Sequence, residues 1–117
     1  MGNRFSAECP FRGSSADAEE RALAIIALFN WKVEGDGEGR INARTSMSAF
    51  GRGEYVTLSF LKGNRMFVES ESVSAFQFFD FGKNRNNVEK FIEAFRDRKL
   101  PLEEKERSFL DRYFSGR

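Results

Sequence analysis

The sequence predicts an α+β fold: an N-terminal helix, a four-stranded antiparallel meander, and two C-terminal helices packed on one face of the sheet. Three observations favour this fold. Apolar residues recur at helical spacing near both ends of the 117-residue chain and at period two in its middle. The glycine-containing breaks between the period-two segments are too short to join any but antiparallel neighbours. Fourteen phenylalanines supply a packed interior and exclude an intrinsically disordered chain.

The N-terminal region divides into an arm and a helix. Residues 1–13 are interpreted as a flexible N-terminal arm because two glycines and a proline interrupt them, and residues 14–117 as a single α+β domain. A helix is expected over residues 15–29, since Ser14 with Asp17 three residues later is typical of a helix start. Its apolar stripe consists of Ala18, Ala22, Ile25, Ile26 and Phe29.

Four strands are expected in the middle of the chain, separated by glycine-containing turns. They cover residues 31–34, 41–47, 55–60 and 65–73. Because successive side chains of a strand point to opposite faces, the sheet should have one apolar and one polar face. Arg40, Arg44 and Tyr55 fall on the polar face, with Arg52 in a neighbouring turn.

Two helices are expected after the sheet. The first covers residues 86–98, because apolar residues recur at i, i+3, i+4 and i+7, and Asn86 with Glu89 three residues later resembles a capping box. The second covers residues 101–114, where a proline suits the first turn. The apolar residues 76–81 are interpreted as a short extended segment beneath the sheet.

The composition argues against an enzyme. The chain has no histidine, so a catalytic base would have to be a carboxylate, a lysine or a tyrosine. Its one cysteine, Cys9, can form neither an internal disulfide nor a zinc site. Glu69 and Glu71 share one strand face, which is interpreted as solvated. We therefore expect no catalytic residues, no cofactor and no bound metal.

The sequence also bears on location and partners. No apolar run approaches the roughly 18 residues of a membrane-spanning helix, and no export signal precedes the first helix. With a free cysteine, this predicts a cytoplasmic protein without a membrane span. The N-myristoylation pattern at residues 1–6 is interpreted as a chance match. A formal net charge of +1 gives no general attraction to nucleic acid.

The most distinctive polar segment runs from Asp80 to Asn87, directly before a predicted helix. In a functional interpretation, the free N–H groups of the helix start bind an anion with help from Lys83 and Arg85. In a structural interpretation, which the residues favour, Gly82 permits a turn, an asparagine caps the helix, and Asp80 bonds nearby backbone amides.

Part of this segment resembles a known motif. The hexapeptide Phe79–Asn84, with Asn87–Val88 after it and Trp31–Lys32 upstream, is similar to a motif of small bacterial domains of unknown function, Phe-Asp-aromatic-Gly-Lys-Asn. The resemblance covers residues 29–95, and Phe81 stands where tryptophan is expected. It implies an α+β fold and a cytoplasmic or membrane-associated bacterial setting, and it implies no activity.

Two functions remain open. The first is a non-enzymatic interaction or regulatory module whose polar sheet face holds a protein partner or a second copy of the chain, since Arg and Tyr are enriched at interfaces. The second is a binder of a small apolar or anionic-lipid ligand, with an apolar pocket and a cationic mouth. The candidate ligand-binding residues are Phe76, Phe78, Phe79, Asp80, Phe81, Lys83, Asn84 and Arg85.

Overall fold

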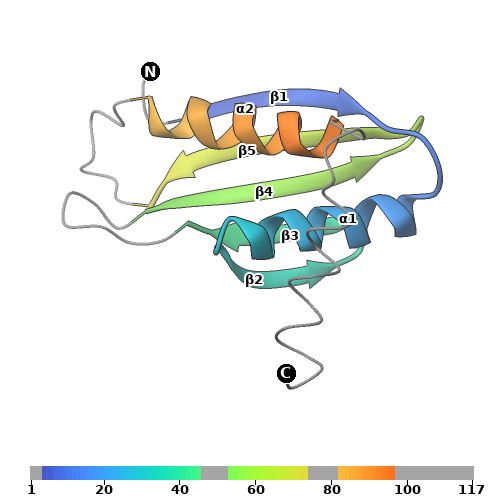
Figure 1. Cartoon of the computed structure of the whole chain (residues 1–117), viewed down its shortest axis with the longest axis horizontal. Helices are drawn as coiled ribbons and strands as arrows, with labels where there is room; N and C mark the ends of the chain where they lie inside the picture. Colours follow the sequence, from blue (N-terminus) through green and yellow to red (C-terminus); the bar gives the residue numbers. More distant parts are fainter. Residues whose placement is uncertain (1–3, 46–52, 74–81, 97–117) are drawn as a thin grey trace.

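The structure is a computed structural model of the chain, and it describes residues 4–45, 53–73 and 82–96. These residues form one antiparallel sheet and two helices, and both helices lie on the same face of the sheet (Figure 1). Neither helix is long and apolar enough to cross a membrane. In chain order the elements are β1 (Arg4–Pro10), α1 (Ser15–Leu28), β2 (Lys32–Gly37), β3 (Arg40–Arg44), β4 (Glu54–Leu61), β5 (Arg65–Ser72) and α2 (Lys83–Arg96).

The sheet has five strands in the order β1-β5-β4-β3-β2, so the prediction of a four-stranded sheet is wrong. Strands β2 to β5 form the expected meander, but residues 4–10, assigned to the arm, pair with β5 along its length. They do so because the segment alternates apolar and polar side chains. Phe5 and Ala7 pack against the core and Cys9 is buried within it, while the side chains between them are exposed.

The helices also differ from the prediction. The described residues contain one N-terminal helix, α1, and one C-terminal helix, α2, rather than two C-terminal helices. The helix predicted over residues 101–114 lies outside the described residues. Helix α2 begins at Lys83, three residues before the predicted start, and the Asn86 N–H donates to the Gly82 carbonyl at 2.9 Å. Asn86 therefore belongs to the first turn and is not the cap.

Helix α1 begins at Ser15 as its sequence predicts and ends at Leu28, one residue before the predicted end. The Ser14 hydroxyl caps the helix by accepting a hydrogen bond from the Asp17 N–H at 3.0 Å. The predicted stripe faces the sheet, with four of its residues buried: Ala18, Ala22, Ile25 and Ile26. After Phe29, Asn30 takes a positive φ of 63°, a conformation that asparagine tolerates better than most residues and that ends the helix.

The β2–β3 turn is tighter than expected from the glycine-rich residues 35–39. Strand β2 continues through Gly37, with a register shift between Val33 and Gly35 that accommodates one extra residue. The turn itself is made by Glu38 and Gly39, which have φ values of 55° and 76°. Two consecutive positive φ values give the turn the twist that joins antiparallel strands directly.

The core lies between the sheet and the two helices. Its sheet side is mainly aliphatic, and aromatic rings contributed by α2 and the chain after α1 fill its middle. Phe91 is fully buried and stacks on Trp31 and on Phe95, with ring centroids 6.2 Å apart in both pairs. The rings of Phe11 and Phe95 pack in a T-shaped arrangement, with their centroids 6.4 Å apart. The rings thus connect α2 to the segments before and after α1.

Cys9 provides a test of the unpredicted strand β1. Its side chain is buried in the core, and this burial raises the pKa of the thiol. The native thiol should therefore react with Ellman's reagent about 100-fold or more slowly than the thiol of the unfolded chain. Equal labelling rates with and without denaturant would contradict the placement of β1.

The raised pKa of Cys9 also makes stability depend on pH. Because the pKa is raised in the folded state, the stabilisation from burying the neutral thiol is complete below the pKa of the unfolded chain. It is lost as pH rises through the pKa of the folded state.

Candidate functional site

The predicted ligand site can be examined only in part. Lys83, Asn84 and Arg85 form the first residues of α2. The other predicted site residues lie outside the described residues, and the apolar pocket that they were expected to line stays a prediction. These are Phe76, Phe78, Phe79, Asp80 and Phe81.

The three described residues have different environments. Lys83 is half-buried, Asn84 is fully buried, and Arg85 is exposed. The Arg85 Nε donates to Glu89 at 2.9 Å, and its guanidinium group lies 5.5 Å from the centroid of the Phe5 ring. The Asn84 side chain is directed into the protein, and the Arg85 side chain lies along the helix surface. The first turn of α2 therefore does not place Lys83, Asn84 and Arg85 around one ligand.

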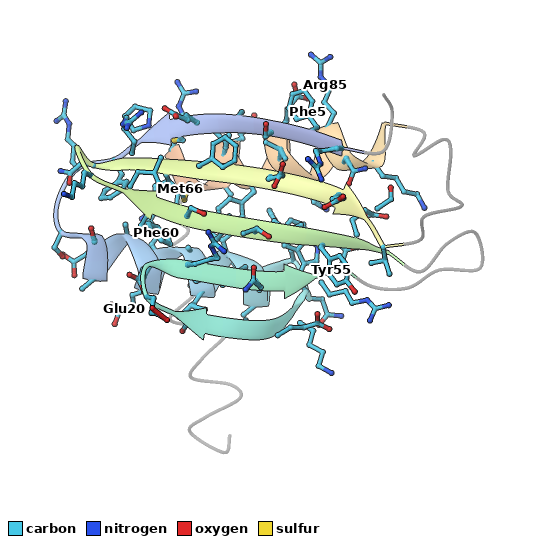
Figure 2. The ribbon with its side chains drawn as sticks, turned by 180° about the vertical axis from the view of Figure 1, so that it is seen from behind. Phe5, Glu20, Tyr55, Phe60, Met66 and Arg85 are labelled. Carbon is cyan, nitrogen blue, oxygen red and sulfur yellow. The ribbon has the colours of Figure 1, made fainter. Side chains whose placement is uncertain are left out.

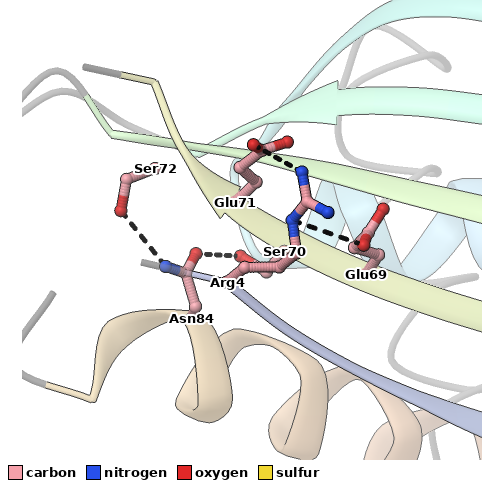
Figure 3. A network of polar contacts seen from close by, with 6 residues as sticks. All are labelled: Arg4, Glu69, Ser70, Glu71, Ser72 and Asn84. Carbon is pink, nitrogen blue, oxygen red and sulfur yellow. Dashed lines mark hydrogen bonds and ion pairs between the residues drawn. The ribbon is translucent and has the colours of Figure 1, made fainter. Parts of the chain in front are cut away.

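Asn84 connects α2 to strand β5 (Figure 3). The Ser70 hydroxyl donates to the Asn84 Oδ1 at 2.6 Å, and the Asn84 Nδ2 donates to the Ser72 hydroxyl at 3.1 Å. All three residues are buried. Buried polar groups without partners are costly, so each side chain depends on the others to remain in the interior.

Asn87, one turn further along α2, extends these contacts to β4. Its Nδ2 donates to the Glu54 Oε1 at 2.9 Å and to the Ser70 hydroxyl at 3.2 Å. The same Glu54 oxygen accepts from the Thr45 hydroxyl at 3.0 Å. We call this set the buried polar network: Thr45, Glu54, Ser70, Ser72, Asn84 and Asn87.

The sequence contained a signal for the buried polar network. Asn84 and Asn87 lie three residues apart and therefore share one face of α2. On β5, Ser70 and Ser72 continue the alternation of Met66 and Val68, so all four side chains point toward the core. The network holds the start of α2 on the sheet, so Asn84 and Asn87 have buried hydrogen-bond partners on the strands and neither is the predicted helix cap.

The face of the sheet opposite the helices, which we call the open face, carries polar and charged side chains (Figure 2). Strand register aligns them in rows, one of which runs Lys32, Arg44, Tyr55, Glu71, Arg4 across all five strands. Tyr55 is 42% exposed, one of two large hydrophobic residues in the described part of the chain with such exposure. Arg40, Arg44 and Tyr55 thus occupy the polar face as predicted, whereas Arg52 lies outside the described residues.

In the half of the open face formed by β5 and β1, which we call the paired half, the charged side chains form ion pairs with one another. Arg4 donates to Glu71 at 2.8 Å and lies 3.7 Å from Glu69 (Figure 3). Arg65 contacts Glu8 at 3.1 Å. Glu69 and Glu71 therefore share the outward face, as predicted, and each is close to the same arginine.

The half formed by β2 and β3 has charged side chains of both signs, since its hairpin carries Glu34, Asp36 and Glu38 as well as three cations. Lys32 pairs with Arg44 across the two strands, and Arg40 lies on the same face of β3. Glu34 of β2 lies 3.9 Å from the Arg44 guanidinium group. The Arg44 guanidinium group also lies over the Tyr55 ring, 5.8 Å from its centroid.

A hollow of about 760 Å³ lies at the other end of α2, between the end of β1 and the start of α1. Phe11 and Phe95 contribute its apolar lining, and Asp17, Glu20 and Arg21 are among its charged residues. The Arg21 Nε donates to the Phe95 carbonyl at 3.1 Å. None of Lys83, Asn84 and Arg85, the described residues of the predicted site, is among its lining residues.

Comparison with known proteins gives a family and no activity. Residues 3–95 match a family described as "Protein of unknown function (DUF1499)". No curated protein matches the chain. Among the described residues, no three His, Cys, Asp or Glu side chains come together in a group that could hold a metal ion.

Proposed function

Because the chain belongs to the DUF1499 family, whose function is unknown, we propose from its geometry that the domain is a non-enzymatic interaction module that binds a protein partner on its open face. The observation that carries this proposal is the one-sided architecture. Helices α1 and α2 cover one face of a five-stranded sheet, and the other face displays an exposed tyrosine, Tyr55, with Arg44 beside it (Figures 1 and 2).

The residue types on the open face support a binding role. Tyrosine and arginine are enriched among the residues that dominate binding energy at protein interfaces. Tyr55 offers a large rigid ring, and Arg44, held beside it, loses little conformational freedom when a partner docks. The cross-strand rows next to the row of Arg44 and Tyr55 carry small side chains on β3 and β4, namely Asn42, Thr57 and Ser59. A partner can therefore approach the sheet closely.

The non-enzymatic part of the proposal is supported by how the carboxylates are used. Glu69 and Glu71, the pair that resembles a catalytic carboxylate site, lie beside Arg4 on an exposed surface. Glu54 is buried and accepts hydrogen bonds from Thr45 and Asn87. Neither arrangement places a carboxylate in a cleft where it could reach a proton of a bound substrate, which general acid–base catalysis requires.

Site-specific photo-crosslinking in the native cells tests the proposal. A photoreactive phenylalanine analogue at Tyr55 should give a discrete protein adduct. The same analogue at Ala27, which is exposed on α1 on the far side of the molecule, should give none. Absence of any adduct from Tyr55, or equal adducts from both positions, would contradict the proposed binding face.

A further inference from the structure

We infer that strand β1 is a self-association edge, at which a second copy of the chain pairs with it in the antiparallel direction. Ser6 of one copy would lie opposite Ser6 of the other, and the two five-stranded sheets would join into one. This edge is separate from the open face, to which the proposed function assigns a partner. Three features support the pairing: the free backbone groups of β1, the charges along it, and the position of α2.

Strand β1 presents hydrogen-bonding groups at one edge of the sheet (Figure 1). The Phe11 N–H donates to the Asn64 carbonyl at 2.9 Å, which continues the register of β1 with β5 and marks a hydrogen-bonded pair. Because such pairs alternate with non-hydrogen-bonded pairs along an antiparallel ladder, every second residue before Phe11 bonds β5. The residues in between direct their N–H and C=O groups toward the free edge: Arg4, Ser6 and Glu8. Within the described part of the chain, no backbone partner is recorded for these groups.

The two edges of the sheet differ in how well they can receive another strand. Strand β2, at the opposite edge, has a register shift between Val33 and Gly35, an irregularity that hinders pairing with a further strand. Strand β1 pairs with β5 without a shift over seven residues. Pro10, which has no N–H to donate, lies at the end of β1 and outside the residues that would pair. Strand β1 is therefore the edge better suited to a second copy.

The charges along β1 are self-complementary. An antiparallel pair centred on Ser6 places Arg4 of each copy directly opposite Glu8 of the other, on the open-face side. The pairing uses all three residues whose backbone groups point to the edge. Centring it one residue earlier or later on the strand no longer places Arg4 opposite Glu8. Charge and hydrogen bonding thus select the same register.

The ion pairs of the paired half are compatible with this arrangement. Arg4 contacts Glu71, and Glu8 contacts Arg65, in both cases on the β5 side of β1. These contacts are exposed and leave the other side of each charge open to the edge. In the joined sheet, positive and negative side chains would alternate from β5 of one copy across the seam to β5 of the other. The charges would therefore fix the register, while the backbone hydrogen bonds would supply the main attraction.

The helix side of β1 is also complementary to itself. Phe5 and Ala7 pack against the core on this side, and the pairing centred on Ser6 sets Phe5 of each copy opposite Ala7 of the other. A large side chain thus meets a small one at both positions. Apolar surface at the seam would be covered without two rings competing for the same space.

The position of α2 leaves room for a second copy. Helix α2 packs on β1 and β5 and lies above the boundary between them (Figure 1). Strands of a sheet are about 4.8 Å apart, so the two copies of α2 would lie two strand spacings, or about 10 Å, from each other. This is close to the separation at which helices normally pack, about 8–10 Å. The joined sheet would therefore carry a packed pair of helices over its seam.

Arg85 and Glu89 lie on the side of α2 that would face this seam. The Arg85 guanidinium group is 5.5 Å from the centroid of the Phe5 ring, and Figure 2 shows both side chains at the β1 edge. The two-fold axis at Ser6 passes close to them, because Phe5 is the neighbouring residue. Two antiparallel copies of α2 would bring Arg85 of one near Glu89 of the other, so opposite charges meet on this side as well.

Sedimentation velocity of the full chain tests the inference. The chain should be a monomer at about 10 µM and largely a dimer at about 1 mM. Ser6→Pro removes the central N–H and places a ring in the seam, so it should weaken dimerisation about tenfold or more. The variant should fold, because this N–H does not bond β5 and an edge strand tolerates proline there. Ser6→Ala, which keeps the N–H, is the matched control and should dimerise like the unaltered chain.

Mixing two charge variants tests the register without relying on proline. Arg4→Glu and Glu8→Arg each set like charges opposite one another, so each variant alone should dimerise about tenfold or more weakly. In an equimolar mixture, every acidic side chain at these positions faces a basic one, and dimerisation should return. Thermal unfolding of each variant separates lost pairing from lost folding. Failure of the mixture to dimerise would overturn the register centred on Ser6.

Amide hydrogen exchange locates the dimer surface. The amides of Arg4, Ser6 and Glu8 should exchange more slowly at the higher chain concentration, because only in the dimer are they hydrogen-bonded. A chain that stays monomeric at about 1 mM, a dimer that Ser6→Pro leaves intact, or a dimer that Tyr55→Ala abolishes would overturn the inference. Photo-crosslinking at Tyr55, repeated in the Ser6→Pro chain, tests the open face independently of the dimer.

Discussion

Replacement of Phe91 by alanine is expected to lower the free energy of unfolding by about 3–5 kcal/mol, the usual cost of truncating a buried phenylalanine. Phe91 is fully buried, and it stacks on Trp31 and Phe95. Its removal takes the middle ring out of the group that joins α2 to the rest of the core. Urea denaturation followed by circular dichroism would measure the change as a lower midpoint.

Phe67→Ala is the matched control for Phe91→Ala. Phe67 is half-buried on the open face, between Ser59 and Glu8 in its row, and neither α1 nor α2 packs over it. The same truncation should therefore cost only about 1 kcal/mol, because little apolar surface leaves the interior. A similar loss for the two variants would show that the open face is covered in the free protein, which contradicts the architecture described above.

Replacement of Asn84 by alanine is expected to lower the free energy of unfolding by about 3 kcal/mol, because it removes hydrogen-bond partners from two buried hydroxyl groups, of Ser70 and Ser72. The variant also leaves a space between α2 and β5. Asn84→Leu should not restore stability, since a leucine fills the space but cannot bond the serines. Urea denaturation, with amide hydrogen exchange at the start of α2, would measure both effects.

Asn86→Ala serves as the control within the same helical turn. Asn86 is exposed, so its replacement should change the free energy of unfolding by no more than about 0.5 kcal/mol. Equal losses for Asn84→Ala and Asn86→Ala would indicate a general effect on helix α2 and would contradict the role given to the buried polar network.

Local patterns in the sequence predicted most of the elements because their causes are local. The Ser14 cap and the stripe of α1, and the alternation in β3, β4 and β5, each depend on residues close together in the chain. The same alternation correctly placed Arg40, Arg44 and Tyr55 on the face without helices. The polar open face was thus predictable as a surface, whereas the cross-strand pairing of Lys32 with Arg44 could be known only from the strand register.

The wrong predictions concern residues whose contact partners are distant in the sequence. Residues 4–10 alternate clearly, but their partner strand is β5, and a proline at the end of the segment suggested a loose arm. Neighbours in sequence suggested a ligand site that includes Asn84 and a helix cap at Asn86, and they suggested no distant partners for Asn84 and Asn87. Their actual partners, Ser70 and Glu54, lie on strands that only the tertiary fold brings to α2.

The pairing of β1 with β5 has a consequence for how the protein folds. Arg4 and Glu71 are 67 residues apart in the chain, and Glu8 and Arg65 are 57 apart, yet they are neighbours in the sheet. During synthesis, the four strands of the meander can pair in succession as they emerge, whereas β1 must wait for the last of them. Pairing across such a long loop is entropically slow, so joining the first strand to the last is expected to limit the folding rate. Until then, a nascent chain exposes the apolar side of β1, so the first strand of the sheet to be synthesised is among the last to be protected.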